Sequence, residues 1–291
     1  MRLVFLHGIH QDGRDPVAMT REWVSDLESG IGRSGALAGV QIALPFYGDA
    51  LVAAAKLASG AITQGSSADE DRELARFLAD GLEEQAANAG VGRAEIAAEQ
   101  ETAPTTGDAV PLGFPMNRRI SAIVNILERI SPLRGDLALR LLSQAHAYLK
   151  KPHVRRTVED IVRPTLGSGP LVLVTHSLGT IVGFVLLREA ARAGRPINVP
   201  LLVTMGSPLT LATVQRAIGP TFANPTGVER WLNLRDADDF ISLNRDLEPP
   251  LFTGPIENTS DFENPGYDAH AIPGYLSHRL TAQAIAAALK L

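Results

Sequence analysis

The chain has 291 residues, and with 45% hydrophobic residues it can bury a large core, either as one α/β domain or as a domain with a sizeable insertion. Its net charge of −5, without a tract of lysine or arginine, gives no basis for nucleic-acid binding. It contains no cysteine, which excludes disulfides and cysteine-ligated metal sites.

A short apolar run near the start, Leu3 to Leu6, is typical of a buried strand. This run is too short for a secretory signal or a membrane span, so we expect a cytoplasmic protein without an integral membrane segment.

The loop after this strand, from His7 to Gly13, has a glycine directly behind the strand. Such a glycine lets backbone N–H groups face the space above the sheet edge, where an oxyanion would be bound. We therefore take Ile9 N–H as a candidate oxyanion donor and His10 as a candidate substrate contact. The alternative is that the glycines of this loop only shape a turn.

The next segments alternate helix and strand. A helix is expected to open at Asp15-Pro16, with proline near its first turn, and a second strand runs from Val40 to Leu44. Tyr47 follows this strand at the end where open parallel sheets bind ligands, so it is a candidate substrate contact. Packing of Tyr47 on the core is the alternative.

From about Leu51 to Lys150 the alternation of strand and helix stops. Two stretches, Ile120–Ile130 and Leu137–Leu149, are amphipathic and rich in leucine and isoleucine. About a hundred residues is far beyond the usual connection between neighbouring strands. We therefore expect a helical cap at 51–150, inserted into a core made of 1–50 and 151–291, which would exclude water and shape an apolar pocket.

The most informative stretch changes from the apolar run Leu171–Val174 to a polar turn and then to a helix. A serine between strand and helix stands clear of the chain, beside helix N-terminal N–H groups that can hold negative charge. Ser177 is therefore the candidate nucleophile, Leu178 N–H the second candidate oxyanion donor, and His176 a candidate substrate contact. The alternative is that Ser177 merely caps the helix.

A further short strand, Trp231–Leu234, delivers three aspartates at its carboxyl end. Asp239 stands just before an apolar pair and is expected to point inward, where it could orient a catalytic base. Asp236 and Asp238 are expected to stay solvated as cap or turn residues, which is the commoner fate of aspartate in a loop.

His270 lies in a loop before the last helix, Ala282–Leu289. A histidine can take the serine proton near neutral pH and return it to a leaving group, so His270 is the candidate base. The chain order Ser177, Asp239, His270 is the order in which α/β-hydrolases present their triad.

The chain resembles an α/β-hydrolase of the lipase and esterase kind. Five segments carry the resemblance: Phe5-Leu6-His7-Gly8, Val174-Thr175-His176-Ser177-Leu178-Gly179, Gly206-Ser207-Pro208-Leu209, Trp231-Leu232-Asn233 with Asp239, and Asp268-Ala269-His270. The resemblance implies an α/β fold with a mostly parallel sheet flanked by helices, and it identifies the loop around Ile9 with the oxyanion loop of that family.

Three departures from the family pattern stand out. Thr175 replaces the first glycine of Gly-x-Ser-x-Gly, Phe240 stands where such relatives often carry proline, and the amino-terminal hairpin is absent, which suggests a reduced sheet.

The expected function is hydrolysis of a carboxylic ester through an acyl-enzyme. The expected substrate is a small molecule with a lipophilic acyl group, and no metal or organic cofactor is required. A serine peptidase or an acyltransferase would use the same triad. A non-catalytic protein-binding module on this fold is also open, because fold does not fix function, and the sequence names no protein partner.

Overall fold

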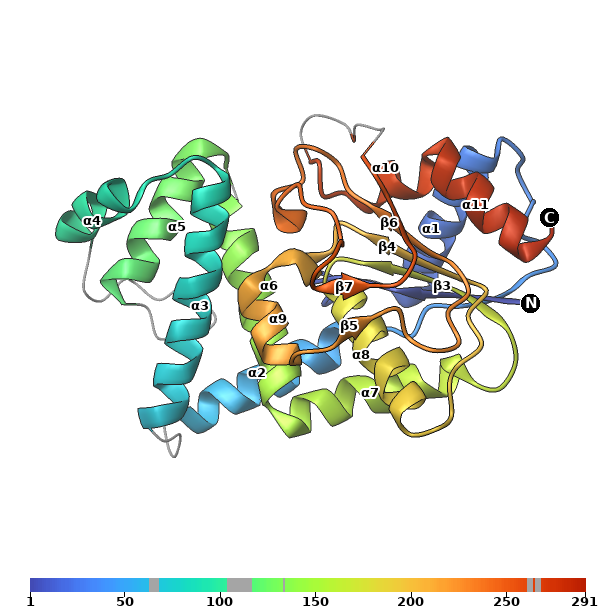
Figure 1. The fold of residues 1–291 in the computed structure, drawn as a ribbon, viewed down its shortest axis with the longest axis horizontal. Helices are drawn as coiled ribbons and strands as arrows, with labels where there is room; N and C mark the ends of the chain where they lie inside the picture. Colours follow the sequence, from blue (N-terminus) through green and yellow to red (C-terminus); the bar gives the residue numbers. More distant parts are fainter. Residues whose placement is uncertain (63–67, 104–116, 133, 261–263, 265–267) are drawn as a thin grey trace. The chain divides into compact units, whose positions relative to one another are not determined.

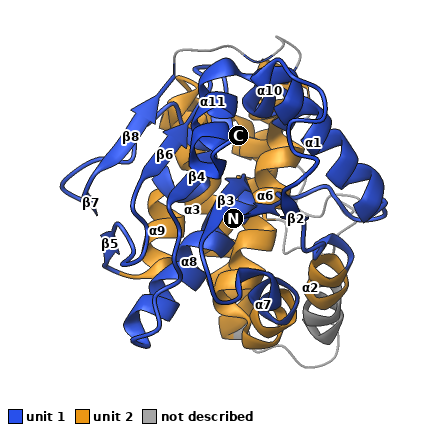
Figure 2. Ribbon diagram, turned by 90° about the vertical axis from the view of Figure 1, so that its right-hand side faces the viewer, with its two compact units in different colours: residues 1–49, 159–210, 220–291 blue, residues 50–158, 211–219 orange. Residues whose placement is uncertain are grey.

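The computed structural model describes residues 1–62, 68–103, 117–132, 134–260, 264 and 268–291 (Figure 1). The chain forms two compact units, coloured separately in Figure 2. We call residues 1–49, 159–210 and 220–291 the sheet unit, and residues 50–158 and 211–219 the helical unit. The division falls within helices α2 and α7, which each contribute to both units.

The sheet unit is built on a six-stranded sheet in which every neighbouring pair of strands is parallel. The strands lie in the order β2-β1-β3-β4-β6-β8. Their bounds are Arg2–Leu6 for β1, Gln41–Ala43 for β2, Leu171–His176 for β3, Leu201–Met205 for β4, Trp231–Leu234 for β6 and Ile256–Thr259 for β8. The predicted α/β class with a mostly parallel sheet flanked by helices is confirmed.

The strand order reverses at β1, because the chain passes from β1 to β2 on one side and then returns to place β3 on the other. In parallel sheets such a reversal opens a crevice at the carboxyl ends of the two central strands. Leu6 of β1 pairs with Thr175 of β3, so the loops that follow the two strands start side by side. These are the loops that contain Ile9 and Ser177.

The two faces of the sheet follow the period of two that a strand imposes. Leu3 and Phe5 of β1 belong to a core cluster with helix α1, Pro16–Ile31. Leu6 points to the opposite face, where a Cβ on Gly183 of helix α8, Leu178–Arg192, would lie 3.4 Å from its Cδ1. Helices thus cover both faces, which explains why all six residues of β3 are buried.

Helix α1 starts where the sequence predicts it. The Asp15 side chain accepts a hydrogen bond from Val17 N–H at 2.8 Å, and Pro16 is the first helical residue. Trp23 and Leu27 face the core, and the Trp23 ring meets the Phe5 ring edge-on with 5.4 Å between centroids. Helices α10, Ile272–Ser277, and α11, Arg279–Leu289, pack against α1.

In the described part of the segment predicted as an insertion, all the secondary structure is helical. The helices are α2 (Gly48–Ile62), α3 (Ala68–Asn88), α4 (Arg93–Thr102), α5 (Arg118–Ile130) and α6 (Arg134–Lys150), and α7 (Pro152–Leu166) follows after the predicted insertion. The amphipathic stretches at 120–130 and 137–149 are α5 and α6, which pack on each other and on α3. A Cβ on Gly81 of α3 would lie 2.5 Å from Cδ2 of Leu142 of α6, so glycine permits this close approach.

Several elements were not expected from the sequence. Strand β8 adds a sixth member to the sheet, and β5 (Phe222–Ala223) pairs with β7 (Phe252–Thr253) in a separate parallel ribbon. Helix α9, Ala212–Ile218, follows β4 in the chain but belongs to the helical unit, where it packs on α3 and α6.

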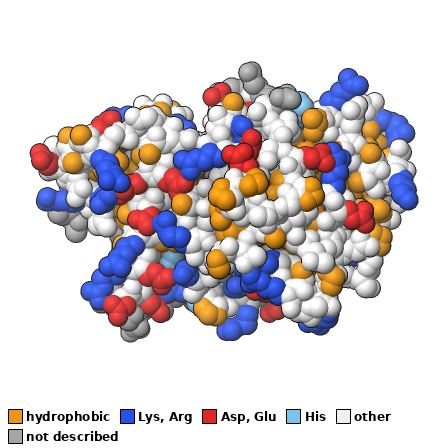
Figure 3. Space-filling view, viewed as in Figure 1, with side chains coloured by type: hydrophobic (Ala, Val, Ile, Leu, Met, Phe, Trp, Pro, Cys, Tyr) orange, Lys and Arg blue, Asp and Glu red, His pale blue; other side chains and the backbone are white. Residues whose placement is uncertain are grey.

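Charged side chains of both signs are interspersed on the face drawn in Figure 3. The described chain has ion pairs at its surface, such as Arg129 with Glu99 at 2.6 Å and Arg216 with Asp80 at 2.7 Å. Exposed pairs of this kind contribute little to stability. Across the described residues, no helix combines the length and the apolar character needed to cross a membrane.

Replacing Trp23 with alanine tests the core between α1 and the sheet. We expect Trp23→Ala to lower the free energy of unfolding by about 3–5 kcal/mol, because it leaves a cavity against Phe5. Val17→Ala on the same helix, at a side chain that is 57% exposed, should change it by less than about 0.5 kcal/mol. Urea unfolding followed by circular dichroism measures both. Equal losses in the two variants would contradict this packing.

Candidate active site

A single residue turns β3 into α8. The strand ends at His176 and the helix begins at Leu178, so Ser177 alone makes the turn, with φ 53° and ψ −127°. A residue other than glycine rarely adopts a positive φ, and such strain costs about 1–3 kcal/mol. Strain of this kind persists where surrounding contacts hold it and often marks a functional position. Ser177 itself is buried, with 1% of its surface exposed.

The contacts that hold Ser177 come from β4 and α8. Ser177 N–H donates to the Met205 carbonyl at 3.0 Å, and the Ser177 carbonyl accepts the Thr180 hydroxyl at 2.7 Å. Because the Thr180 hydrogen is used there, the Ser207 hydroxyl must donate to Thr180 Oγ1 across 2.8 Å. The strained turn is therefore fixed on both sides of its α-carbon. Sequence reasoning treated Ser207 only as part of a loop and missed this contact.

The replacement of glycine by Thr175 has a local compensation. The Thr175 hydroxyl donates to the Val203 carbonyl at 2.9 Å, and its methyl group faces Gly183 of α8. A Cβ on Gly183 would lie 3.0 Å from Thr175 Cγ2, so the missing side chain on the helix makes room for the threonine. Gly179, which matches the pattern, has no such freedom, since a Cβ there would collide with the Leu6 carbonyl.

The loop after β1 packs directly against Ser177. A Cβ on Gly8 would lie 2.6 Å from the Cβ of Ser177 and 3.1 Å from its Oγ, so only glycine fits. Leu178 is the first residue of α8, so its N–H is one of the donors that no carbonyl within the helix can reach. Ile9 N–H makes no hydrogen bond in the described part of the chain.

The His7 side chain orients the Ile9 N–H. Its Nδ1 lies 2.8 Å from the Gly8 carbonyl, which can only accept, so Nδ1 carries the hydrogen, and Nε2 accepts Tyr47 N–H at 3.1 Å. Since a trans peptide directs C=O and N–H to opposite sides, holding the Gly8 carbonyl fixes the direction of Ile9 N–H. Burial lowers the pKa of His7 to about 4, which keeps this neutral form at pH 7.

Tyr47, a predicted substrate contact, packs against His7 in the structure. Tyr47 has no exposed surface, its hydroxyl donates to the His7 carbonyl, and its ring stacks on the His7 ring at 3.8 Å. It therefore braces the loop, as the packing alternative had it. His10 lies exposed in the same loop, with φ 59°, and stays a predicted substrate contact.

Asp239 is the aspartate that meets His270. The Nδ1 of His270 lies 2.8 Å from Asp239 Oδ2 and 3.0 Å from Oδ1, and both side chains are buried. The carboxylate also accepts the Ile241 N–H at 3.0 Å and the Tyr275 hydroxyl at 2.7 Å. A buried carboxylate needs such donors to remain charged.

The expectation that Asp236 stays solvated is wrong, whereas Asp238 is exposed as predicted. Asp236 is only 1% exposed because its carboxylate accepts two backbone donors, Asp238 N–H at 2.8 Å and the N–H of Asn264. It forms the turn that carries Asp239, a structural role that its position in a loop concealed.

His176, another predicted substrate contact, lies against His270 in the structure. His176 Nε2–H donates to the His270 carbonyl at 2.8 Å, and the two rings lie 4.5 Å apart. Burial, together with charge repulsion from His270, lowers the pKa of His176 well below its ordinary value, so it stays neutral. This residue holds the backbone of His270 in position.

Two of the three predicted catalytic side chains follow strands, Ser177 after β3 and Asp239 in the loop after β6, and His270 reaches Asp239 from the loop before α10. Gly206, directly after β4, separates the β3 end with Ser177 from the β6 loop with Asp239, and a Cβ on it would lie 2.8 Å from His270 Nδ1. Ser177 Oγ and His270 Nε2 are both buried and have no hydrogen-bond partner among the described residues. They are the two atoms between which a triad would transfer a proton, and such bonds are often long without substrate.

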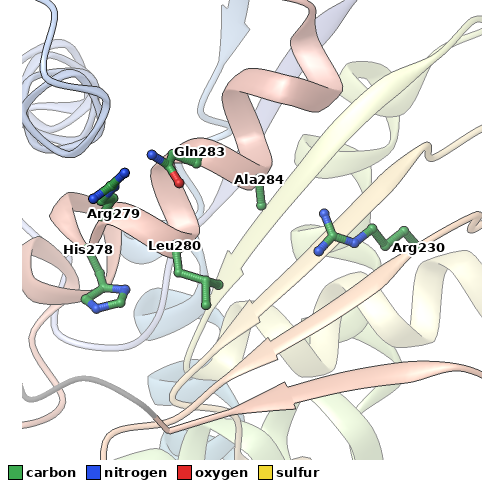
Figure 4. Close-up of a pocket in the computed structure, with 6 residues that line it drawn as sticks. All are labelled: Arg230, His278, Arg279, Leu280, Gln283 and Ala284. Carbon is green, nitrogen blue, oxygen red and sulfur yellow. The ribbon is translucent and has the colours of Figure 1, made fainter.

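A metal-ligand cluster and a surface hollow are the other features that could form a site. Nowhere in the described ranges do three His, Asp or Glu side chains gather as metal ligands. A surface hollow of about 560 Å³ lies at the first half of α11 (Figure 4). It is lined by Arg230, His278, Arg279, Leu280, Gln283 and Ala284.

The chain matches no protein-family model, no curated protein and no solved structure.

Replacing Gly206 with alanine tests the packing at the centre of the site. We expect Gly206→Ala to lower the free energy of unfolding by about 1–3 kcal/mol more than Gly32→Ala. Both positions have positive φ, but a Cβ on Gly206 would lie 2.6 Å from Asp239 Oδ2, while one on Gly32 would have no neighbour within 4 Å. Urea unfolding of both variants measures the difference. Equal destabilisation would show that Asp239 and His270 do not crowd this glycine.

Proposed function

We propose that this protein is a serine hydrolase with an α/β-hydrolase fold, which cleaves a carboxylic ester through Ser177, His270 and Asp239. The observation that carries the proposal is the buried hydrogen bond of 2.8 Å between His270 and Asp239, set beside a serine in a strained strand-to-helix turn. A histidine held by a buried carboxylate next to a serine is the arrangement that activates a hydroxyl as nucleophile.

The chemistry would run in two halves. In the first, His270 Nε2 takes the proton of Ser177 Oγ as the oxygen attacks the ester carbonyl, and the same proton then goes to the departing alcohol. In the second, water attacks the acyl-enzyme with His270 again as base. The N–H groups of Leu178 and Ile9 would hold the oxyanion in both halves, and losing one such donor typically costs about 100- to 1000-fold in turnover.

The order of the strands supports the α/β-hydrolase assignment. The candidate nucleophile follows a strand next to the reversal in the sheet, and Asp239 and His270 come later in the chain, in the order of that family. We assign the helical unit as the cap of this fold because its main segment is inserted between β2 and β3.

The preference for a lipophilic acyl group rests on the burial of the site. The apolar residues of α5 and α6 are used in packing within the helical unit, where Ile123 and Leu142 are fully buried. They therefore give no information on substrate. Ser177 and His270, by contrast, are themselves withdrawn from solvent, an environment that favours an apolar acyl chain over a charged one.

Replacing the nucleophile tests the proposal directly. We expect Ser177→Ala to abolish hydrolysis of short p-nitrophenyl esters and labelling by a fluorophosphonate probe, because no other group would form the acyl-enzyme. Ser29→Ala, at an exposed serine on α1, should leave both unchanged. Labelling that survives Ser177→Ala would reject Ser177 as nucleophile, and wild-type protein that neither labels nor hydrolyses would favour a binding module. Product analysis with added alcohol or amine acceptors, and with peptide substrates, separates hydrolysis of esters from acyl transfer and peptidase activity.

Replacing the aspartates tests the assignment of the acid. We expect Asp239→Asn to lower kcat by about 10⁴-fold, since the amide cannot stabilise the imidazolium or its correct tautomer. Asp238→Asn should leave kcat unchanged, because that side chain is exposed. Steady-state kinetics on one ester gives both values. The reverse ranking would move the role of the acid to Asp238.

A further inference from the structure

Tyr275 links the two loops that carry Asp239 and His270. It lies on α10, five residues after His270, and is fully buried. The Asp236 N–H can only donate, so the tyrosine oxygen accepts from it at 2.9 Å, and the hydroxyl hydrogen is directed to Asp239 Oδ2 at 2.7 Å. No feature of the sequence pointed to this residue.

We propose that Tyr275 is a positioning residue of the acid–base pair, which fixes the Asp239 carboxylate and sets how strongly it binds the His270 imidazole. The inference deepens the proposed function and rests on it. Tyr275 acts through Asp239, because it contacts neither Ser177 Oγ nor any other atom that reacts in the proposed mechanism.

Two donors share one oxygen of the Asp239 carboxylate. Asp239 Oδ2 receives both the Tyr275 hydroxyl, at 2.7 Å, and His270 Nδ1, at 2.8 Å, while Oδ1 receives the Ile241 N–H and lies 3.0 Å from the same Nδ1. Hydrogen bonds to a charged group are among the stronger ones in proteins. Because each donor to Oδ2 disperses the charge available to the other, the tyrosine hydroxyl weakens the pull of Asp239 on the imidazole.

The tyrosine keeps this role at all working pH values. Burial, together with the negative charge of Asp239, raises the pKa of Tyr275 well above its ordinary value, so the hydroxyl stays a donor. Its ring belongs to the core cluster beneath the sheet and cannot turn away without breaking that packing.

The same network holds the other flank of His270. Asp236, whose N–H anchors the tyrosine, accepts the N–H of Asn264, and the Asn264 amide donates to the carbonyl of Ala269 at 2.6 Å. The turn at Asp236 thus holds both Ala269, the residue before His270, and the Asp239 carboxylate. A shift of Tyr275 would be felt by both members of the pair.

The kinetic test compares Tyr275→Phe with Tyr148→Phe, which removes the hydroxyl of another fully buried tyrosine in the helical unit. We expect Tyr275→Phe to lower kcat about 10-fold with little change in KM, and to move the acidic limb of the kcat/KM profile to higher pH by roughly half a unit or more. The carboxylate, with one donor fewer, would hold the imidazole proton more tightly. Tyr148→Phe should leave the limb in place. An unmoved limb in Tyr275→Phe would overturn the proposal.

A second measurement does not depend on activity. The proton between His270 Nδ1 and Asp239 gives a downfield NMR resonance, assigned by its loss in His270→Gln. We expect it to move further downfield in Tyr275→Phe, because the hydrogen bond to Asp239 strengthens, and to stay in place in Tyr148→Phe. If wild-type protein proved inactive on every ester, the proposed function would fail while this resonance still reported on the role of Tyr275. A resonance that did not respond would reject that role.

A further variant covers the case in which Tyr275→Phe does not fold. Site-specific 3-fluorotyrosine at position 275 keeps the hydroxyl and makes it a stronger donor. The proton resonance should then move upfield and the acidic limb to lower pH, opposite to the effect of removing the hydroxyl. Shifts in the same direction as Tyr275→Phe would contradict the sharing of Oδ2.

Discussion

The structure depends most on one buried hydrogen bond, that between the Asp239 carboxylate and the His270 imidazole. A carboxylate without exposed surface is costly unless donors surround it, and Ile241 N–H and the Tyr275 hydroxyl supply the rest. Ile241 follows Asp239 in the loop after β6, whereas His270 and Tyr275 come from residues 270–275, so the bond forms only when both parts of the chain are in position. His176 then fixes the His270 backbone from the β3 side.

The second constraint is backbone strain at Ser177. A positive φ in a serine is stable here because β4 and α8 hold the residue through the Met205 carbonyl and the Thr180 hydroxyl. Thr175 stands where the usual pattern has glycine, and its methyl group fits because Gly183, on the facing side of α8, has no side chain.

The sequence predicts local features better than distant ones. Asp15-Pro16, the apolar strands and the small residues around Ser177 act within a few positions, so the α1 start and the strand-to-helix turn follow from them. Strand β8 reads Ile-Glu-Asn-Thr and lacks the apolar run that marks the other strands, because it lies at the edge of the sheet. The uses of Tyr47 and His176 depend on partners 40 and 94 residues away, and no spacing rule reveals them. Asp236 was misjudged for the same reason, since one of its partners, Asn264, lies 28 residues further on.

The central claim is that Ser177 attacks under the control of His270, with the Leu178 and Ile9 N–H groups ready for the oxyanion. A crystal structure of the protein after reaction with a fluorophosphonate tests it most directly. The account predicts phosphorus bonded to Ser177 Oγ, a phosphonyl oxygen about 3 Å from both N–H groups, and His270 Nε2 within hydrogen-bond reach of the adduct. An adduct on another residue, or one whose oxygen faces away from Leu178 and Ile9, would contradict it.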